Sequence, residues 1–324
     1  MKVGIFGCGA YGMALSSILI ENNHEVTMWT KFAEERDILD KERCNEKKLP
    51  NFRLDQSIKI TTNIEECIKD KDLLIVAIPA AYVDDLAVTM QPYIYNNHIL
   101  IATKGIEQDT GLFINQILNK YIKTKNIAVI SGPSFAVDLI TKMPAGLSLA
   151  SKSNKTLKLC REALANKYIK VAETKDVIGT EICGSIKNVI ALSAGMLEGL
   201  GANDSTTAML LTEATKDMMS IMKAFKANKK TVISFAGLGD LLLTCTSIKS
   251  RNFRFGKLIG EGASQEQIKE FLSQTTVEGF YTLESIYKLL KDKKVSMPII
   301  DIIYDIAIRG ENPQKLLTFL VEKD

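Results

Sequence analysis

Met1-Lys-Val-Gly-Ile-Phe-Gly7-Cys8-Gly9-Ala10-Tyr11-Gly12 opens the chain and decides the fold of its first half. The apolar run before Gly7 predicts a buried strand, and the run 14–20 after the glycines predicts a helix. In a G-x-G-x-x-G turn the first glycine permits the tight turn, the second lets the backbone approach a pyrophosphate, and the third lets the helix pack closely on the strand. A second strand predicted at Glu25–Trp29 completes the pattern, which indicates a dinucleotide-binding βαβ unit rather than an ordinary glycine turn.

The residue after the second strand bears on the choice of nucleotide. NAD-binding units commonly carry an Asp or Glu about 20 residues past the glycines, where it holds the ribose 2′-hydroxyl. Here Lys31 stands at that point and is followed by Phe32. A cation there suits a 2′-phosphate and favours NADPH, whereas the alternative is a solvated lysine that opens the next helix. Both NADPH and NADH therefore stay open as the cofactor.

Length and charge narrow the class of protein. A chain of 324 residues is long enough for two domains with cores of their own. A net charge of +3, without a basic stripe interleaved with aromatic residues, argues against nucleic acid as a partner. The apolar stretches break before the ~20 residues of a membrane span, and Lys2 is followed at once by the glycine turn, which leaves no signal peptide. We therefore expect a cytoplasmic protein without an integral membrane segment.

Cysteine and histidine usage narrows the chemistry. The six cysteines are scattered without a C-x-x-C pair, so we expect small core residues in a reducing compartment and no metal site. The two histidines, His24 and His98, each follow asparagines in turn-like stretches, and we expect both at the surface. Without a histidine base, proton transfer falls to Lys, Asp, Glu, Tyr or Cys.

The rest of the first half continues the alternation of strands and helices. Three apolar runs, at 72–79, 99–102 and 127–130, predict parallel strands, and each ends in small, polar or charged residues. Because the carboxyl ends of parallel strands meet at one edge, we expect a ligand crevice there. Residues 36–57 are expected to form an irregular connection. The residues that follow the three strands include Pro79, then Thr103-Lys104-Gly105, then Ser131-Gly132-Pro133-Ser134-Phe135-Ala136.

From about residue 175 the pattern becomes helical and stays so. The fold class is therefore α/β, with a Rossmann-like doubly wound sheet over residues 1–177 and an all-helical domain over 178–324. Methionines in one of these helices are expected to fill its core. They are Met209, Met218, Met219 and Met222.

Three stretches of the second half carry candidate chemistry. Lys187 and Asn188 lie in an otherwise apolar helix, so Lys187 is either a snorkelling surface residue or a catalytic one. Burial near another cation, such as Lys104, would make it exchange a proton near neutral pH. Asp240 follows a glycine turn and is either a helix N-cap or a functional acid. The third stretch, Ser250-Arg251-Asn252, offers a hydroxyl, a guanidinium and an amide that suit a phosphate monoester.

These residues resemble those of bacterial-type NAD(P)-dependent glycerol-3-phosphate dehydrogenases from end to end. The resemblance implies interconversion of dihydroxyacetone phosphate and sn-glycerol 3-phosphate for glycerophospholipid synthesis, and it suggests a homodimer. The matching blocks are the opening glycine motif, Lys104-Gly105-Ile106-Glu107, residues 131–136, Ser185-Ile186-Lys187-Asn188-Val189, Gly237-Leu238-Gly239-Asp240-Leu241, residues 244–247, Ser250-Arg251-Asn252 and Val277-Glu278-Gly279.

The resemblance also implies roles for individual positions. Lys187 corresponds to the proton donor and acceptor, with Lys104 and Asp240 completing the catalytic set. Substrate positions are Lys104, Gly132, Ser134, Lys187, Asn188, Asp240, Ser250, Arg251 and Asn252. Cofactor positions are Gly7, Gly9, Ala10, Tyr11, Gly12, Lys31, Phe32, Lys104, Ala136, Arg251, Thr276 and Glu278.

Some positions depart from the family pattern, and two rival functions remain. Thr207 and Glu213 stand where relatives often carry Lys and Arg, and Thr276 replaces a frequent Val. One rival is a related reductase that acts on a keto acid, since Arg251 could bind a carboxylate. The other is a non-catalytic NADPH-binding sensor, against which the retained Lys104, Lys187, Asp240 and Arg251 argue.

Overall fold

The computed structural model describes residues 1–108 and 110–322, and within them the chain divides into two compact units. The first unit comprises Met1–Lys104 and Ile114–Val177, and the second comprises Gly105–Phe113 and Ile178–Asp324. The short segment Gly105–Phe113, which the sequence analysis assigned to the first domain, belongs to the helical unit. It does so because Ile106 and Phe113 are buried in the core of that unit.

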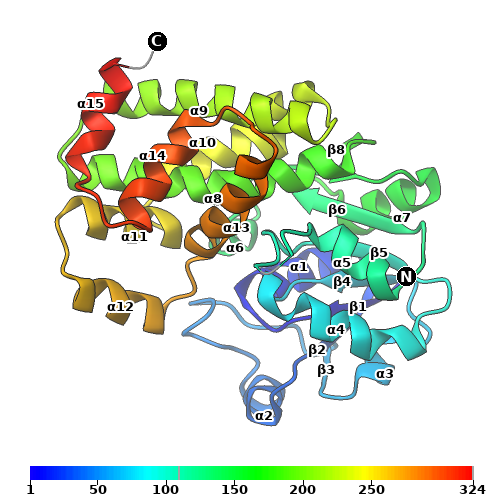
Figure 1. The fold of residues 1–324 in the computed structure, drawn as a ribbon. Coiled ribbons are helices and arrows are strands. Elements are labelled where there is room, and N and C mark those ends of the chain that lie inside the picture. Colours follow the sequence, from blue (N-terminus) through cyan, green and yellow to red (C-terminus); the bar gives the residue numbers. More distant parts are fainter. Residues whose placement is uncertain (109, 323–324) are drawn as a thin grey trace. The chain divides into compact units, whose positions relative to one another are not determined.

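The first unit is built on a doubly wound sheet (Figure 1). Among the described residues eight strands form it, in the order β3-β2-β1-β4-β5-β6-β7-β8. All neighbouring strands are parallel except β6 and β7. The predicted Rossmann-like fold is thereby confirmed. The strands are β1 (Lys2–Phe6), β2 (Glu25–Trp29), β3 (Lys59–Thr61), β4 (Leu73–Val76), β5 (His98–Ile101), β6 (Ile127–Ser131), β7 (Ala145–Ala150) and β8 (Ile169–Thr174).

The helices of this unit follow the predicted alternation, with one correction. The connection that was expected to be irregular begins with a regular helix, α2, because residues 33–42 bury Leu39 against the sheet side and leave charged residues outward. Arg43 then ends that helix in a left-handed conformation with a φ of 56°. The helices are α1 (Ala10–Glu21), α2 (Ala33–Glu42), α3 (Ile64–Ile68), η1 (Ala80–Tyr82), α4 (Val83–Met90), η2 (Gln91–Tyr93), α5 (Ile114–Tyr121), α6 (Ala136–Leu139) and α7 (Asn154–Leu164).

His98 contradicts the expectation of a surface turn. It is the first residue of β5, it is buried, and its Nδ1 lies 2.9 Å from the Thr156 hydroxyl on α7. Burial lowers the pKa of His98, and the charge of Lys155 acts in the same direction. His24 is half-buried, and burial followed by the charge of the N-terminal amine lowers its pKa as well.

The cysteines behave as small apolar residues. Burial raises the pKa of the Cys8 thiol to about 12, which removes the thiolate character that reactive cysteines need. Burial likewise raises the pKa of Cys67, Cys160 and Cys245. The buried cysteines are Cys8, Cys67, Cys160, Cys183 and Cys245, and Cys44 is half-buried.

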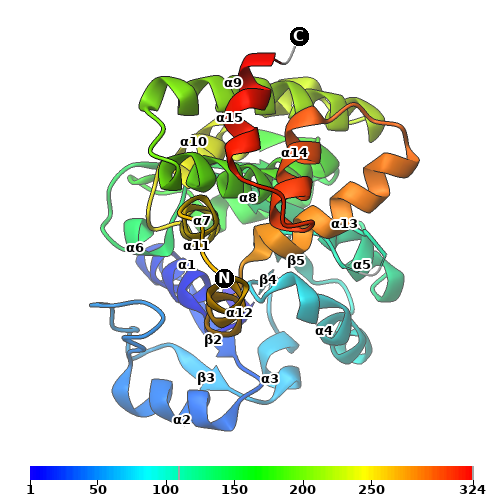
Figure 2. The same cartoon turned by 60° about the vertical axis from the view of Figure 1, so that its left-hand side comes forward.

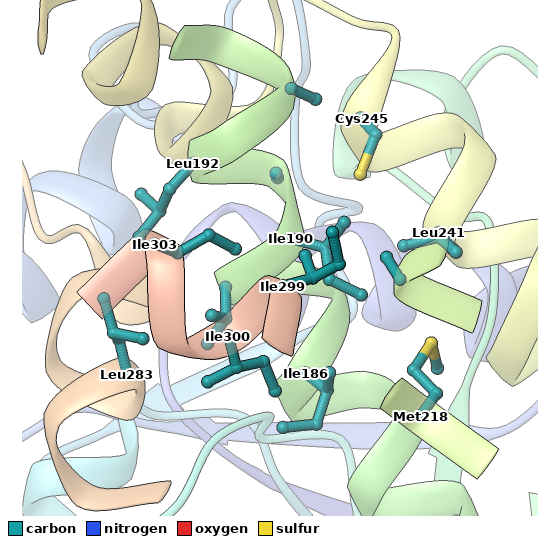
Figure 3. Packing of buried hydrophobic residues seen from close by; sticks show 14 of the residues in the cluster. Ile186, Ile190, Leu192, Met218, Leu241, Cys245, Leu283, Ile299, Ile300 and Ile303 are labelled. Carbon is teal, nitrogen blue, oxygen red and sulfur yellow. The ribbon is translucent and has the colours of Figure 1, made fainter. Parts of the chain in front are cut away.

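The second unit is helical, and α14 lies at the centre of its packing. Figure 2 shows α14 between α9, α13 and α15, against which it packs. Figure 3 shows Ile299 of α14 beside Ile190 of α8, and Ile303 beside Leu192, in the hydrophobic core of this unit. The buried Asp217 of α9 accepts from the Ile299 and Ile300 N–H groups at the start of α14. The elements are α8 (Val177–Gly199), α9 (Asp204–Ala224), η3 (Lys229–Ile233), η4 (Phe235–Gly239), α10 (Asp240–Cys245), α11 (Arg251–Gly260), α12 (Gln265–Gln274), α13 (Glu278–Asp292), α14 (Pro298–Ala307) and α15 (Gln314–Glu322).

The methionine expectation holds in part. Met218 and Met222 are fully buried, and Met219 packs against the same core. Met209 is 42% exposed, so the expectation of a core position is wrong for this residue. Only one face of helix α9 packs into the core, and Met209 lies outside that face.

Helix α8 is long and apolar enough to cross a membrane by length and composition, but 94% of its most apolar window is buried inside the protein. A helix at the core of a folded unit is also long and apolar, because other helices surround it. The burial of α8 fits such a core helix.

Helices α8 and α11 touch backbone against backbone. A Cβ atom added to Gly256 would lie 1.9 Å from the Leu192 carbonyl oxygen, and one added to Gly195 would lie 2.0 Å from the Phe253 carbonyl oxygen. Side chains at these points would force the helices apart, because backbone atoms cannot swing aside. The glycines that line this crossing are Gly195, Gly199, Gly256 and Gly260.

Candidate active site

A buried lysine forms the centre of the second unit's polar interior. Lys187 Nζ donates to Asp240 Oδ1 at 2.5 Å and to Thr244 Oγ1 at 2.8 Å. All three residues are at most 5% exposed. An ammonium group buried among apolar residues is unfavourable unless it is paired and hydrogen-bonded, and here it has both kinds of partner.

The local fold explains why these side chains meet. Asp240 is the first residue of α10 and directly follows η4, a single π-helical segment of the kind that often marks functional positions. Gly237 lets this segment fold tightly, since a Cβ there would lie 2.1 Å from the Val232 carbonyl oxygen. Asp240 is not the N-cap of α10, a position that Gly239 occupies, so the structural alternative for Asp240 is wrong.

The charge next to Lys187 differs from the expected one. A neighbouring cation was expected, whereas within its own unit Lys187 lies against the Asp240 carboxylate. A carboxylate favours the charged ammonium form. The Asp240 carboxylate therefore stabilises the ammonium form of Lys187.

Thr244 is a member of this cluster that sequence reasoning did not select. Its hydroxyl accepts from Lys187 and donates to the Asp240 carbonyl oxygen at 2.6 Å. The signal was present, because residues four apart on a helix share a face and Thr244 follows Asp240 by four positions.

The candidate phosphate site is the N-terminus of α11. Ser250 caps this helix by accepting from the Phe253 N–H at 3.2 Å, and Arg251 follows as an exposed first residue. The positive end of the helix dipole and a guanidinium at the same place suit an anion. Asn252 is buried one position further on.

Asn252 joins this helix to the start of α13. Its Oδ1 accepts from the Gly279 N–H at 2.8 Å. A Cβ on Gly279 would lie 2.2 Å from the Asn188 carbonyl oxygen, so the start of α13 lies directly on α8 at that residue. The structure thus brings together Asn188, Asn252 and Glu278, the last being the half-buried first residue of α13. Thr276 is exposed just before this helix.

In the first unit Gly7 and Gly12 make the close contacts that their spacing predicted, and Gly9 leaves open space. Gly7 has a φ of 119°, and a Cβ there would lie 2.5 Å from the Ala77 carbonyl oxygen. A Cβ on Gly12 would lie 2.1 Å from the Gly7 carbonyl oxygen, so strand and helix pack closely. Gly9 has nothing within 4 Å of its Cβ position. That open space at the start of α1, next to Ala10, fits the pyrophosphate of a dinucleotide.

The other first-unit positions follow parallel strands at the same edge of the sheet. Lys31 and Phe32 follow β2, and both side chains are exposed. Lys104 follows β5, and Thr103 before it donates to the Ile78 carbonyl oxygen at 2.7 Å. Gly132, Ser134 and Ala136 follow β6, and the Tyr11 hydroxyl lies 3.0 Å from Ser134 Oγ.

One of the departures from the family pattern is accommodated locally. Glu213 of α9 pairs with Lys216 one turn on, at 2.6 Å. Thr207 lies half-buried near the start of the same helix, and nothing in the structure explains why it replaces a Lys.

A dinucleotide-type glycine turn on a doubly wound sheet, together with a buried lysine–carboxylate pair in a helical unit, defines the class of NAD(P)-dependent oxidoreductases. The family model for the NAD-dependent glycerol-3-phosphate dehydrogenase N-terminus matches residues 2–157, and the model for the C-terminus matches residues 176–318. The chain belongs to the NAD-dependent glycerol-3-phosphate dehydrogenase family, and the resemblance inferred from its motifs is confirmed.

Individual relatives agree over the full length. The chain is 32% identical to glycerol-3-phosphate dehydrogenase [NAD(P)+] of Staphylococcus epidermidis over 100% of its own length and 98% of the relative. It is 35% identical to that of Fusobacterium nucleatum, with 100% and 97% covered. The crystal structure of glycerol-3-phosphate dehydrogenase from Coxiella burnetii matches with a TM-score of 0.93 at 28% identity, covering 99% of both chains. A ketopantoate reductase of Ralstonia eutropha shares the fold alone, at 14% identity and a TM-score of 0.60.

Proposed function

We propose that this chain interconverts dihydroxyacetone phosphate and sn-glycerol 3-phosphate with NAD(P)H, and that it supplies glycerol 3-phosphate for glycerophospholipid synthesis. The observation that carries the proposal is the buried Lys187–Asp240 pair, supported by the family to which the chain belongs. A protein that merely bound nucleotide would have no use for an ammonium group held in this way.

The first unit is suited to hold the cofactor, which when bound supplies the hydride. Gly9 leaves room for the pyrophosphate at the N-terminus of α1. Further cofactor contacts are assigned by position in the family motifs. They are Gly7, Ala10, Tyr11, Gly12, Lys31, Phe32, Lys104, Ala136, Arg251, Thr276 and Glu278.

Lys187 protonates the carbonyl oxygen of the substrate as hydride reaches the carbon. In this proposal Asp240 keeps the amine charged before the reaction, and Thr244 fixes where the ammonium lies. Lys104 adds positive charge that stabilises the developing alkoxide. In the reverse direction Lys187, once neutral, takes the proton from the hydroxyl.

Arg251 and Asn252 hold the phosphate away from the reacting carbon, so that binding energy from a remote group fixes the orientation of the substrate. The N-terminus of α11, capped by Ser250, supports the same anion. Gly132, Ser134 and Asn188 complete the proposed substrate contacts.

A spectrophotometric assay tests the proposal. Loss of absorbance at 340 nm is followed with dihydroxyacetone phosphate, using NADH and NADPH side by side, and a panel of keto acids serves as the alternative substrates. Turnover of the triose phosphate above every keto acid supports the assignment. Reduction of a keto acid instead would favour the related reductase, and cofactor binding without any turnover would favour a sensor.

The homodimer, which the family resemblance suggests, and the cytoplasmic location both stay predictions. Light scattering on the purified chain measures the first. Fractionation of the source cells measures the second.

A further inference from the structure

Two consecutive hydrogen bonds join helix α1 to the loop that follows β6. The Tyr11 hydroxyl on α1 lies 3.0 Å from Ser134 Oγ, 123 positions away in sequence. Ser134 Oγ in turn donates to the Gly132 carbonyl oxygen at 3.0 Å. Ser134 is buried, at 7% exposure, so its hydroxyl is oriented by these neighbours.

The direction of both bonds follows from counting protons. A carbonyl oxygen has no proton, so in the bond between Ser134 and Gly132 the serine hydroxyl donates its single proton. The bond between the two hydroxyls can then form only if Tyr11 is the donor and Ser134 the acceptor. Ser134 Oγ is left able to accept a further hydrogen bond but unable to donate one.

We propose that Tyr11 is a positioning residue that makes Ser134 an acceptor for the hydroxyl group of the triose phosphate. The inference rests on the proposed function and deepens it. The phosphate and the ketone of dihydroxyacetone phosphate offer acceptor oxygens, and the primary hydroxyl is its one donor at neutral pH. An oxygen that can only accept therefore recognises that hydroxyl, and it disfavours a carboxylate or a phosphate at the same point.

The ring and the hydroxyl of Tyr11 have separable roles. The ring packs against the apolar core of the first unit, where a phenylalanine ring would pack equally well. The hydroxyl alone reaches Ser134. Tyr11→Phe therefore removes the proposed function of this residue while it preserves the packing.

The experiment uses the full chain and compares two substrates under saturating NADPH. One is dihydroxyacetone phosphate, and the other is the phosphate ester of hydroxyacetone, in which a methyl group replaces the hydroxymethyl group. We expect Tyr11→Phe to raise KM for dihydroxyacetone phosphate by about two- to tenfold, the range for one neutral hydrogen bond, with a smaller change in kcat. The same variant should treat the methyl compound as the unmodified chain does. If the methyl compound is not turned over, its inhibition constant serves for the same comparison.

A double-mutant cycle and a matched control complete the design. If Tyr11 acts through Ser134, then Tyr11→Phe added to Ser134→Ala should cause no further loss. Tyr95→Phe removes a hydroxyl from a tyrosine of the same unit that is 91% exposed, and it should change nothing.

Several results would overturn the inference. They are an unchanged KM in Tyr11→Phe, equal losses with both substrates, additive losses in the double variant, or a weakened NADPH affinity in place of the KM effect. An unmodified chain that does not reduce dihydroxyacetone phosphate at all would instead refute the proposed function, and the inference would fall with it.

Discussion

The backbone N–H of Gly279 donates to Asn252 Oδ1 at 2.8 Å, and this bond fixes which way the Asn252 amide is turned. Because an N–H must face an acceptor, the amide oxygen points to α13 and the NH₂ group is turned away from it. The NH₂ group is a donor, as recognition of a phosphate requires. A backbone group of the helix that begins with Glu278 thus orients a proposed substrate contact on α11.

Asn252→Asp tests this orientation. The carboxylate can still accept from Gly279, but it replaces the donor with a negatively charged oxygen that repels phosphate. We expect KM for dihydroxyacetone phosphate to rise by about tenfold to a hundredfold, in line with loss of a hydrogen bond to a charged group. Asn228→Asp, at a position whose side chain caps η3, is the control and should leave KM unchanged. Steady-state kinetics measures KM for dihydroxyacetone phosphate in both variants. An equal rise of KM in the two variants would contradict the proposed orientation of the Asn252 amide.

Lys187→Ala should lower kcat by about 10²–10⁴, as expected for loss of general acid catalysis, and should leave NADPH affinity nearly unchanged. The same change leaves the Asp240 carboxylate buried without its cation, which costs about 3–5 kcal/mol of folding free energy.

The double variant Lys187→Ala with Asp240→Asn separates these two effects. It replaces the buried carboxylate that has lost Lys187 with a neutral amide, so the free energy of unfolding in urea should recover while activity stays low. Recovery of activity together with stability would mean that Lys187 serves only the fold.

Gly9→Ala and Gly12→Ala form a matched pair for the cofactor site. Gly9 has a φ of −74° and open space at its Cβ position, so alanine should leave the thermal midpoint unchanged and weaken NADPH binding. Alanine at Gly12 would lie 2.1 Å from the Gly7 carbonyl oxygen, and it should cost about 1–3 kcal/mol of stability. Calorimetry and fluorescence titration measure the two quantities. Normal NADPH affinity in Gly9→Ala would place the nucleotide elsewhere.

Lys31→Glu tests the choice between the two nucleotides. If the exposed ammonium of Lys31 pairs with the 2′-phosphate, the variant should lose roughly tenfold in NADPH affinity. NADH affinity should stay the same or improve, because an acidic residue can hold the 2′-hydroxyl. A parallel loss for both nucleotides would show that Lys31 acts on a part that they share.

His98 predicts a loss of stability in mild acid. Its pKa in the folded chain lies below the ordinary 6.5, so the folded state binds this proton more weakly than the unfolded state does. Above about pH 6.5 neither state is protonated and stability is at its full value. As the pH falls through 6.5 the unfolded chain is protonated first, and stability declines until the pH reaches the lower folded value.

Urea unfolding between about pH 7 and pH 5 measures this effect. His98→Gln can still bond to Thr156 and should flatten the decline, with His24 responsible for the slope that remains. An equally steep decline in the variant would exclude His98 as its cause.

The sequence predicted the elements whose pattern is local. The strands at Glu25–Trp29 and Ile127–Ser131 fall where the pattern of the sequence placed them. The steric roles of Gly7 and Gly12 are confirmed, because each depends on neighbours within a few positions or on the adjoining strand, whereas the role of Gly9 toward a pyrophosphate stays a prediction.

The predictions that were wrong or left open concern residues whose environment is set by contacts with distant parts of the chain. His98 follows asparagines and resembles a turn residue, yet the start of an inner strand is covered by α7 from 58 positions away. The role of Asp240 was left between an N-cap and a functional acid, because its partner lies 53 positions earlier on another helix. The helix at residues 33–42 was not predicted in full, because it buries only Leu39 and so shows no stripe of apolar residues.

The glycine crossing of α8 and α11 limits how substrate preference can diverge in descendants of this chain. Helices separated by side chains can drift apart or together as those side chains change size, whereas backbone in contact with backbone leaves no such adjustment. The crossing thereby fixes the spacing between the two helices that carry Lys187 and Arg251. New specificities would therefore have to arise from residues at helix ends and in loops, and not from moving the two helices.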